Sequence, residues 1–263
     1  MATFFNAEEV DAQLEREFVE EVVDSMSMVE VLLENLRSNS VSIADSLATL
    51  KRTSHSLLLL CRSSNMPLMQ IIAHRFDEYL VNLHDLSPAN VADIQHFADK
   101  IAAIVRGELT ESALEGGARL VRELPPKKTF AADIDFEVVI PKNVEVMAVL
   151  PERSMAHIVE RELAACGLRS TAVRSPFEAF EHAVRIRPDL IISSMELGPL
   201  SGVDLACAFA AMPRTRNIPF ALFTSYKWGH PLLESLPPRA ALLRKGPSFG
   251  EDLAEALARF SIT

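Results

Sequence analysis

The second half of the chain repeats one pattern five times: a short apolar run followed by a stretch with helical periodicity. The apolar runs cover residues 144–150, 170–174, 189–194, 218–224 and 240–244. Short apolar runs that alternate with helices predict a parallel β-sheet buried on both faces, with right-handed crossover connections. Sheets of this kind bind ligands at the carboxyl ends of their strands. We therefore expect a functional site of this half at that edge.

The first half has a different pattern, in which apolar residues recur every three or four positions and glycine is nearly absent from residue 7 to about residue 106. This spacing predicts helices only. Helix starts are indicated at Ser42 or Asp45, at Pro67, and at Ser87-Pro88, because hydroxyl, carboxylate and proline residues favour the first turn. The first helix has an apolar stripe of Phe18, Val22, Val23, Met26, Val29 and Leu33. We expect four antiparallel helices in a bundle.

A stretch of weak periodicity separates these two patterns. It contains Gly116-Gly117, Pro125-Pro126 and Pro141, which are typical of turns and linkers. The length of 263 residues fits two domains of ordinary size. We predict a helical domain over residues 1–106, a linker over 107–142 and an α/β domain over 143–263. The fold class is therefore α plus α/β, with an antiparallel helical bundle followed by a five-stranded parallel sheet.

Composition and charge argue against several classes of function. The formal charge is -10, from 36 acidic and 26 basic residues, and it disfavours nucleic-acid binding. No apolar stretch approaches the ~20 residues that a membrane span needs, and residues 1–9 do not resemble a signal peptide. Cys61, Cys166 and Cys207 lack disulfide or metal-ligand spacing. We expect a cytoplasmic protein without membrane insertion, metal or cofactor.

Two segments of the second half carry a family resemblance. Residues 188–194, Pro-Asp-Leu-Ile-Ile-Ser-Ser, are followed by Gly202, and residues 218–225 precede Arg244-Lys245-Gly246-Pro247. These segments resemble the third, fourth and fifth strands of response-regulator receiver domains, and the resemblance extends over residues 143–263. It implies a flavodoxin-like fold for the five-stranded sheet. It also implies that Thr224 and Lys245 match residues that contact phosphoryl oxygens in that family.

The carboxylates of the receiver family are missing from this chain. Leu150-Pro151 stands where the family has its acidic pair, and Ser194 stands where it has the phosphoacceptor aspartate. Magnesium needs oxygen ligands, and phosphoryl transfer depends on the metal to neutralise developing charge. A serine hydroxyl without a neighbouring base is a poor nucleophile. We therefore expect a pseudo-receiver with a degenerate site formed by Leu150, Pro151, Ser194, Thr224 and Lys245.

Three further features of this half leave alternatives open. Glu152 and Glu196 could rebuild a metal site, although an exposed carboxylate in a loop is ordinary. Leu242 replaces the aromatic switch residue of the family, which indicates a domain in one fixed state. A helix between Pro231 and Pro237-Pro238 is predicted to be short, and its leucines belong either to the core or to a dimer interface: Leu232, Leu233 and Leu236.

The helical half carries a second resemblance. Residues 50–57 resemble the histidine-bearing helix of histidine phosphotransfer (HPt) domains, particularly the first domain of chemotaxis kinases, and residues 74–80 resemble the next helix. His55 and His74 are nineteen residues apart, as the resemblance requires. It implies that His55 is the candidate phosphoacceptor, supported by His74 and by Asp77, whose carboxylate would orient the imidazole.

This segment also departs from the family pattern. Leu58 and Leu59 lie on the same helix face as His55, at positions where the family usually has a lysine and a glycine. Two interpretations remain: a weakened phosphoacceptor held by Asp77, or a histidine packed in the core. His74 and His84 are more simply structural or solvent-facing residues.

Three functional hypotheses follow from these sequence features. The leading hypothesis is a non-enzymatic adaptor that binds protein partners, such as a histidine kinase, a response regulator or a second copy of itself. The alternative is a phosphocarrier that uses His55, with the pseudo-receiver for docking or regulation. The third is an enzyme or small-ligand sensor with an anion pocket around Ser194, Thr224 and Lys245. It lacks support, because no glycine-rich phosphate loop, catalytic triad or metal cluster is recognisable.

Overall fold

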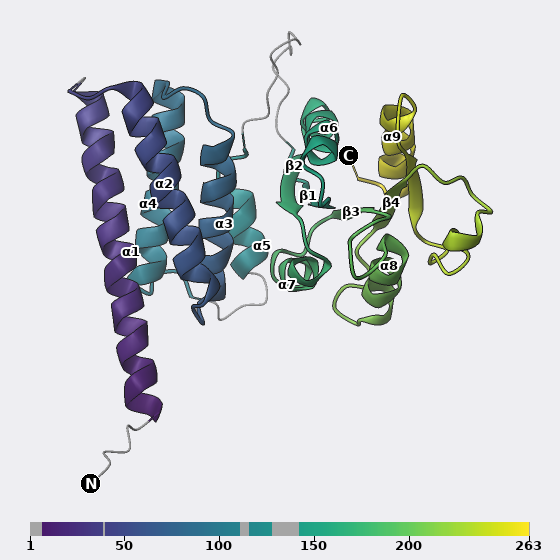
Figure 1. The fold of residues 1–263 in the computed structure, drawn as a ribbon, viewed down its shortest axis with the longest axis horizontal. Coiled ribbons are helices and arrows are strands. Elements are labelled where there is room, and N and C mark those ends of the chain that lie inside the picture. Colours follow the sequence, from purple (N-terminus) through teal and green to yellow (C-terminus); the bar gives the residue numbers. More distant parts are fainter. Residues whose placement is uncertain (1–6, 39, 111–115, 128–141, 263) are drawn as a thin grey trace. The chain divides into compact units, whose positions relative to one another are not determined.

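A computed structural model describes residues 7–38, 40–110, 116–127 and 142–262 (Figure 1). The chain divides into two compact units, Met1–Lys128 and Thr129–Thr263, each described here by itself. The boundary falls inside the stretch 107–142 that the sequence indicates as a linker, and residues 128–141 of that stretch lie outside the described residues. Within the described part of the chain, no helix has the length and apolarity to cross a bilayer.

The helical unit begins with the four expected helices, α1 (Ala7–Arg37), α2 (Ile43–Arg62), α3 (Pro67–Val81) and α4 (Pro88–Val105). The indicated start signals are used as predicted. The Ser42 hydroxyl accepts a hydrogen bond from the Asp45 amide at 3.5 Å, and the Ser87 hydroxyl accepts one from the Asn90 amide at 3.4 Å. Each hydroxyl satisfies an amide that has no acceptor within its own helix.

Aromatic and aliphatic side chains fill the centre of the bundle. The Phe97 ring lies 5.2 Å from the Phe76 ring and 5.4 Å from the Tyr79 ring, measured between centroids. Four residues of the predicted α1 stripe are buried, but Val23 is 45% exposed, so its place in the stripe was wrong. The physical reason is that adjacent helical residues point about 100° apart, so Val22 and Val23 cannot share one narrow face.

A fifth helix, α5 (Gly116–Glu123), lies within the stretch indicated as a linker and belongs to the helical unit. It packs against α3 and buries Leu120 and Val121. Glu123 pairs with Lys100 of α4 at 2.6 Å and with Arg119 at 2.6 Å. Its eight residues begin with two glycines, which have low helix propensity, so local sequence does not predict this helix.

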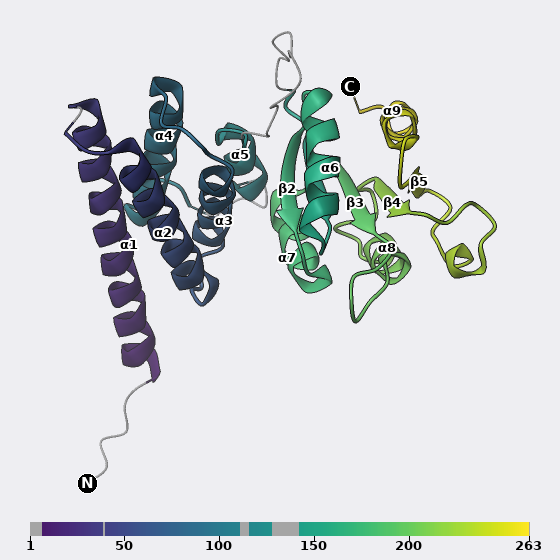
Figure 2. The same cartoon turned by 45° about the horizontal axis from the view of Figure 1, so that its top comes forward.

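The α/β unit has one parallel sheet with strands β1 (Glu145–Val149), β2 (Arg169–Val173), β3 (Leu190–Ser194), β4 (Phe220–Thr224) and β5 (Ala241–Arg244). The strand order is β2-β1-β3-β4-β5, which is the flavodoxin-like order. Helices α6 (Arg153–Ala165) and α9 (Phe249–Arg259) cover one face, and α7 (Pro176–Ile186) and α8 (Gly202–Ala211) cover the other (Figures 1 and 2). The predicted fold class is confirmed.

Alternate residues of each central strand enter two separate cores, one on each face of the sheet. Along β1, Met147 and Val149 pack beneath α7 and α8, whereas Val146 and Ala148 pack beneath α6 and α9. This alternation follows from the two-residue repeat of a strand. It explains why the strands read as continuous apolar runs instead of alternating apolar and polar residues.

The short helix predicted before β5 is a single 3₁₀ turn, Pro231–Leu233. Leu233 and Leu236 are buried in the core beside α8, but Leu232 is 53% exposed. The three leucines therefore do not form one face. The prolines at 231, 237 and 238 restrict the backbone here and supply no amide hydrogen, which keeps the segment to one turn.

Gly202 allows the loop after β3 to pack tightly on the sheet. Its amide donates to the Met195 carbonyl at 2.8 Å. A Cβ atom at this position would lie 2.2 Å from the Ser194 carbonyl oxygen and 2.5 Å from Leu222 Cδ1. Both distances are far below van der Waals contact, so only glycine fits without movement of the backbone.

We predict that Gly202→Ala lowers the free energy of unfolding of the α/β unit by about 1–3 kcal/mol, the usual cost of overpacking. Urea unfolding followed by the fluorescence of Trp228, the one tryptophan in the chain, measures this unit. Gly250→Ala is the matched control, because its Cβ would lie at an ordinary 3.7 Å from Glu162 Oε2. In helix α9 that change should be neutral or stabilising. Equal destabilisation by both variants would contradict the packing account.

Candidate functional site

The carboxyl ends of β1, β3 and β4 form the edge at which the sequence predicts the degenerate site. Leu150 follows β1, Ser194 ends β3 and Thr224 ends β4, and all three are buried. The strands are neighbours in the sheet, with Val149 beside Ser193 and Ser194 beside Phe223. The fold thus brings together Leu150, Ser194 and Thr224, as the strand pattern indicates.

Both hydroxyls at this edge are engaged by the turns that follow their strands. Ser194 Oγ accepts a hydrogen bond from the Glu196 amide at 3.4 Å, and Thr224 Oγ1 accepts one from the Tyr226 amide at 3.1 Å. Serine and threonine commonly stabilise the start of a turn in this way. The two side chains therefore have a structural role at the edge.

Lys245 lies one residue beyond β5 and is exposed. Its amide donates to the Thr224 carbonyl at 2.9 Å, and its ammonium lies 5.7 Å from the centroid of the Phe223 ring. That distance is within the range of a cation–π contact. This contact with the ring places the Lys245 ammonium beside the carboxyl edge, and it involves no carboxylate.

The remaining predicted positions of this site are exposed: Pro151, Glu152 and Glu196. Across the residues that the structure describes, no group of three or more histidine, cysteine, aspartate or glutamate side chains is arranged to hold a metal ion. The polar side chains that the other predicted positions bring to this edge are the hydroxyls of Ser194 and Thr224 and the ammonium of Lys245.

An ion pair that sequence reasoning did not single out closes the turn between β5 and α9. Asp252 accepts a hydrogen bond from the Arg244 amide at 2.8 Å and three from its guanidinium, at 2.6, 2.9 and 3.2 Å. The hydrogen bonds from the Arg244 side chain hold the pKa of the Asp252 carboxyl below its ordinary value. The available sequence signal was the position of Asp252 in the first turn of the last predicted helix, where the helix macrodipole favours negative charge.

In the helical unit, the structure places His55 on the exposed side of α2, with 62% of its side chain accessible. It is not packed in the core. Its Nδ1 atom lies 3.6 Å from Asp77 Oδ1 on α3, and Asp77 is only 15% exposed. This separation is within ion-pair reach and longer than a hydrogen bond. The pair predicted from the resemblance is therefore brought together, with Nδ1 as the nitrogen nearer the carboxylate.

Two neighbours of this pair were not predicted as site residues. The Ser54 hydroxyl, which is fully buried, donates to the same Asp77 Oδ1 atom at 3.2 Å. The Lys51 ammonium, one turn before His55, donates to the Val81 carbonyl at 3.2 Å. Ser54 fixes the carboxylate that faces His55, and Lys51 anchors the end of α3 beside it. Their adjacency to His55 on α2 was the available signal.

The other predicted residues of this region lie differently. His74 Nε2 is 3.7 Å from Glu78 Oε2 on the same helix, within a cluster that also contains Arg75 and Lys127. Leu58 is half-buried and Leu59 is 53% exposed. The His55 face thus has apolar neighbours on its C-terminal side, and His74 belongs to an ionic cluster of the bundle.

The similarity of this chain to known proteins is confined to part of its length. No family model matches the sequence, and no curated protein matches it. Solved structures match less than half of the chain. A putative response regulator from Chloroflexus aurantiacus is 19% identical, with 45% of this chain and 98% of that chain covered and a TM-score of 0.40.

Two further matches are similar in extent. A receiver domain of a sensor histidine kinase from Pseudomonas aeruginosa, solved with a magnesium ion in its active-site cleft, is 20% identical, with 45% and 98% covered and a TM-score of 0.41. The chemotaxis response regulator CheY4 of Vibrio cholerae is 22% identical, with 44% and 98% covered and a TM-score of 0.39. The flavodoxin-like fold of this chain rests on its own strand order.

We predict that Asp252→Asn lowers the urea midpoint of the α/β unit at neutral pH. Because the folded pKa of Asp252 is lowered, its stabilisation is fully present above the unfolded value of about 3.9 and is lost as the pH falls through the folded pKa. The difference from wild type should therefore shrink below about pH 4. The exposed Glu251→Gln is the neighbouring control. A difference that grows on acidification would be inconsistent with this pair.

Proposed function

We propose that this protein is a non-enzymatic signalling protein of the two-component type, which acts through protein partners such as a histidine kinase or response regulator. In this proposal its α/β unit does not accept a phosphoryl group on aspartate. The observation that carries it is the composition of the carboxyl edge, where Leu150, Pro151 and Ser194 occupy the positions of the receiver carboxylates. The fold would then serve as a binding surface.

The physical argument concerns the metal. An acyl phosphate forms on aspartate with a divalent cation that neutralises the charge of the transferring group. Leucine and proline side chains have no oxygen to ligate that cation, and a serine hydroxyl is not ionised near neutral pH. Thr224 and Lys245 could still contact an anion, but contacts of this kind alone supply neither metal ligand nor acceptor.

We expect the fluorescence of Trp228, which lies four residues beyond Thr224 and is 60% exposed, to show no saturable change with magnesium and beryllofluoride. Beryllofluoride binds an aspartate together with the metal, as a stand-in for a phosphoryl group. The control is Pro151→Asp with Ser194→Asp, which places carboxylates at two neighbouring strand ends and leaves the buried Leu150 intact. A saturable response of the wild-type protein would contradict the proposal.

A second candidate function is a histidine phosphocarrier, favoured by the geometry of His55. A phosphohistidine site needs an exposed imidazole and a carboxylate that orients it. His55 is 62% exposed and faces the largely buried Asp77, whose carboxylate is itself held by Ser54. With Nδ1 toward the carboxylate, Nε2 is the nitrogen available for a phosphoryl group. In this case the α/β unit would serve for docking or regulation.

Phosphoramidate tests this candidate without a cognate kinase. The phosphoryl group would leave the nitrogen of phosphoramidate as ammonia departs, and would form a bond to His55 Nε2. We expect one acid-labile phosphoryl group in the intact mass of wild type and none in His55→Gln. Asp77→Asn should slow its formation roughly ten- to a hundredfold, which is the usual effect of removing a carboxylate that orients a histidine in a metal site.

The exposed His96 on α4 offers a matched control, because His96→Gln removes a solvent-facing histidine that lies on another helix. This variant should be phosphorylated like wild type. Phosphoryl incorporation that survives His55→Gln, or that is lost in His96→Gln, would exclude His55 as the acceptor. A wild type that gains no phosphoryl group would exclude this candidate, and the adaptor function without phosphotransfer would be the remaining proposal.

A further inference from the structure

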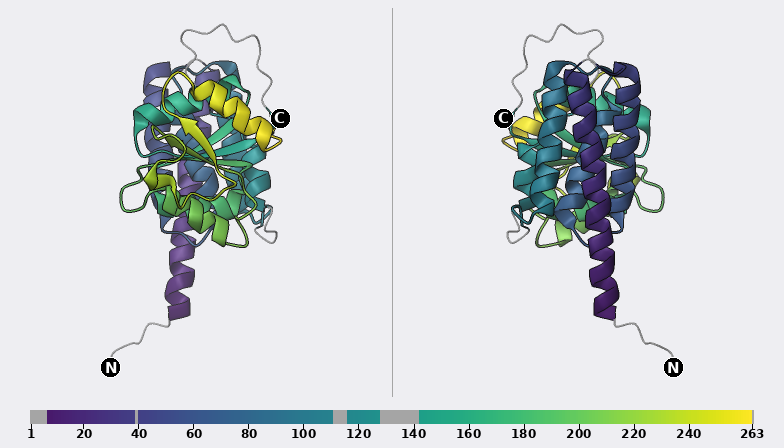
Figure 3. Two further views of the ribbon diagram at one scale, coloured as in Figure 1. Left: turned by 90° about the vertical axis from the view of Figure 1, so that its right-hand side faces the viewer. Right: turned by 90° about the vertical axis from the view of Figure 1, so that its left-hand side faces the viewer.

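Helix α1 is much longer than the helices it packs against. It has 31 residues, whereas α2 has 20 and α4 has 18. At 1.5 Å per residue, its excess over α2 is about 16 Å. Figure 3 shows the N-terminal turns of α1 projecting beyond the rest of the bundle. No residue from Glu9 to Glu21 is buried, and we call this segment the α1 extension.

The α1 extension carries a line of apolar residues of its own. Val10, Leu14 and Phe18 follow at four-residue intervals, and each step turns this line about 40° further around the helix from the side that carries the buried Val22 and Met26. Val10 is 38% exposed and Leu14 is 58% exposed. A helix that is apolar along one side and projects from its bundle has surface suited to a partner.

Charge restricts the nature of that partner. The α1 extension has a single basic residue, Arg16, and six acidic residues: Glu9, Asp11, Glu15, Glu17, Glu20 and Glu21. Two such segments side by side would repel each other, so pairing of extension with extension is disfavoured. The complementary surface has to combine an apolar floor with positive charge.

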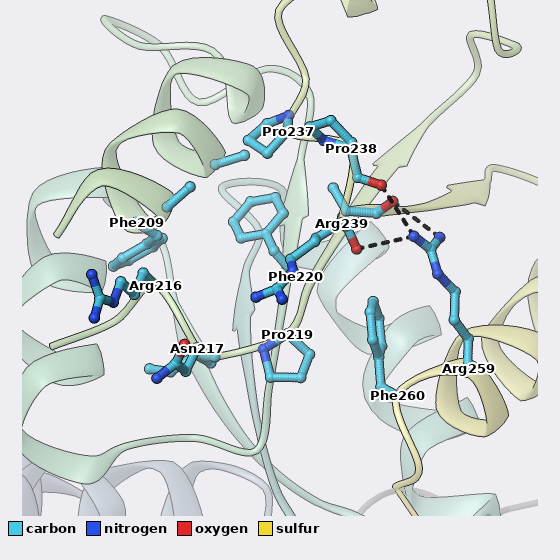
Figure 4. A pocket seen from close by; sticks show the side chains of 14 residues that line it. Phe209, Arg216, Asn217, Pro219, Phe220, Pro237, Pro238, Arg239, Arg259 and Phe260 are labelled. Atoms are coloured by element: carbon cyan, nitrogen blue, oxygen red, sulfur yellow. Dashed lines mark hydrogen bonds between the residues drawn. The ribbon is translucent and has the colours of Figure 1, made fainter. Parts of the chain in front are cut away.

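The α/β unit has such a surface at the amino ends of β4 and β5. A groove of about 710 Å³ is lined there by residues of α8, the loops before β4 and β5, and the end of α9. We call it the amino-edge groove. The half-buried Ile218, Pro219 and Phe260 give it an accessible apolar lining, whereas Phe209 and Phe220 are almost fully buried. Figure 4 shows Pro219 and Phe260 among the residues around the groove.

Arginines surround this apolar lining. Arg216 precedes β4 and Arg239 precedes β5, and both are exposed. The third arginine, Arg259, donates hydrogen bonds to the carbonyls of Ala240, Pro238 and Arg239, at 3.2, 3.1 and 3.3 Å. Figure 4 shows these bonds. Arg259 thus fixes the loop before β5. This holds Arg239, one of the two exposed arginines beside the apolar lining, in place.

We propose that the α1 extension of one copy docks in the amino-edge groove of a second copy. Leu14 and Phe18 would cover the lining formed by Ile218, Pro219 and Phe260, and acidic residues beside Leu14 and Phe18 would face Arg216 and Arg239. Because both surfaces belong to one chain, two copies exchanging them reciprocally form a closed dimer. This inference adds a self-association site and does not depend on the proposed function.

Sedimentation velocity of the full chain over a range of concentrations and salt tests this proposal. We expect reversible self-association that weakens as ionic strength rises. Leu14→Asp, and separately Arg216→Glu with Arg239→Glu, should each raise the dissociation constant at least about tenfold, the effect of losing one good interface contact. A wild type that stays monomeric throughout would overturn the proposal, whether the extension binds another protein or nothing.

A charge exchange distinguishes this contact from other modes of association. Asp11→Arg with Glu17→Arg changes acids that flank the stripe and should weaken association alone. Combining it with Arg216→Glu and Arg239→Glu in one chain should restore association. Glu9→Arg with Glu20→Arg, on the opposite side of α1, is the matched control, and this variant should retain most of the self-association. Failure of the combined variant to associate, with both units folded by circular dichroism and urea unfolding, would refute the assigned contact.

Discussion

Binding of a divalent cation is the constraint on which the proposed function depends. A parallel sheet of this topology presents the carboxyl ends of β1, β3 and β4 together, so the residues at these three strand ends decide the chemistry of the edge. Here those positions hold Leu150-Pro151, Ser194 and Thr224. The hydroxyls stabilise turns, and the Lys245 ammonium lies against the Phe223 ring. The contacts around Gly202 keep the loop after β3 tightly packed on the sheet. Under the proposed function, the edge would lack the carboxylate oxygens that hold magnesium.

Under the proposed function, the two units would differ in how many groups for phosphoryl transfer they contain. In the helical unit, His55 is exposed, Asp77 faces it, and Ser54 holds Asp77 from the buried side. Leu58 and Leu59 stand where the resemblance to phosphotransfer domains implies a lysine and a glycine, which would change the surface that a partner meets. If the α/β unit cannot be phosphorylated, a phosphoryl signal enters this chain only at His55, and the α/β unit contributes through binding alone.

Much of this architecture could be predicted from sequence because its signals are local. The apolar runs follow from burial of both sheet faces, and Ser42 and Ser87 cap helices through their own hydroxyls. The pairing of His55 with Asp77 was predictable only through the family resemblance. The exposure of His55 was not, because the turn of α2 relative to α3 depends on tertiary packing. Helix α5 escaped prediction for a related reason, since packing on α3 overrides its two glycines. The pair of Arg244 and Asp252 joins a strand to a helix, which periodicity does not report.

The most direct test of the central claim is to treat the full chain with acetyl phosphate and magnesium and map any phosphoryl group by mass spectrometry of its peptides. The account predicts that no acyl phosphate, recognised by its sensitivity to hydroxylamine, forms within residues 142–262. A stable phosphoserine at Ser194 is not expected either, because that hydroxyl has no base in its hydrogen bonds. A magnesium-dependent, hydroxylamine-sensitive phosphoryl group in that segment would contradict the account.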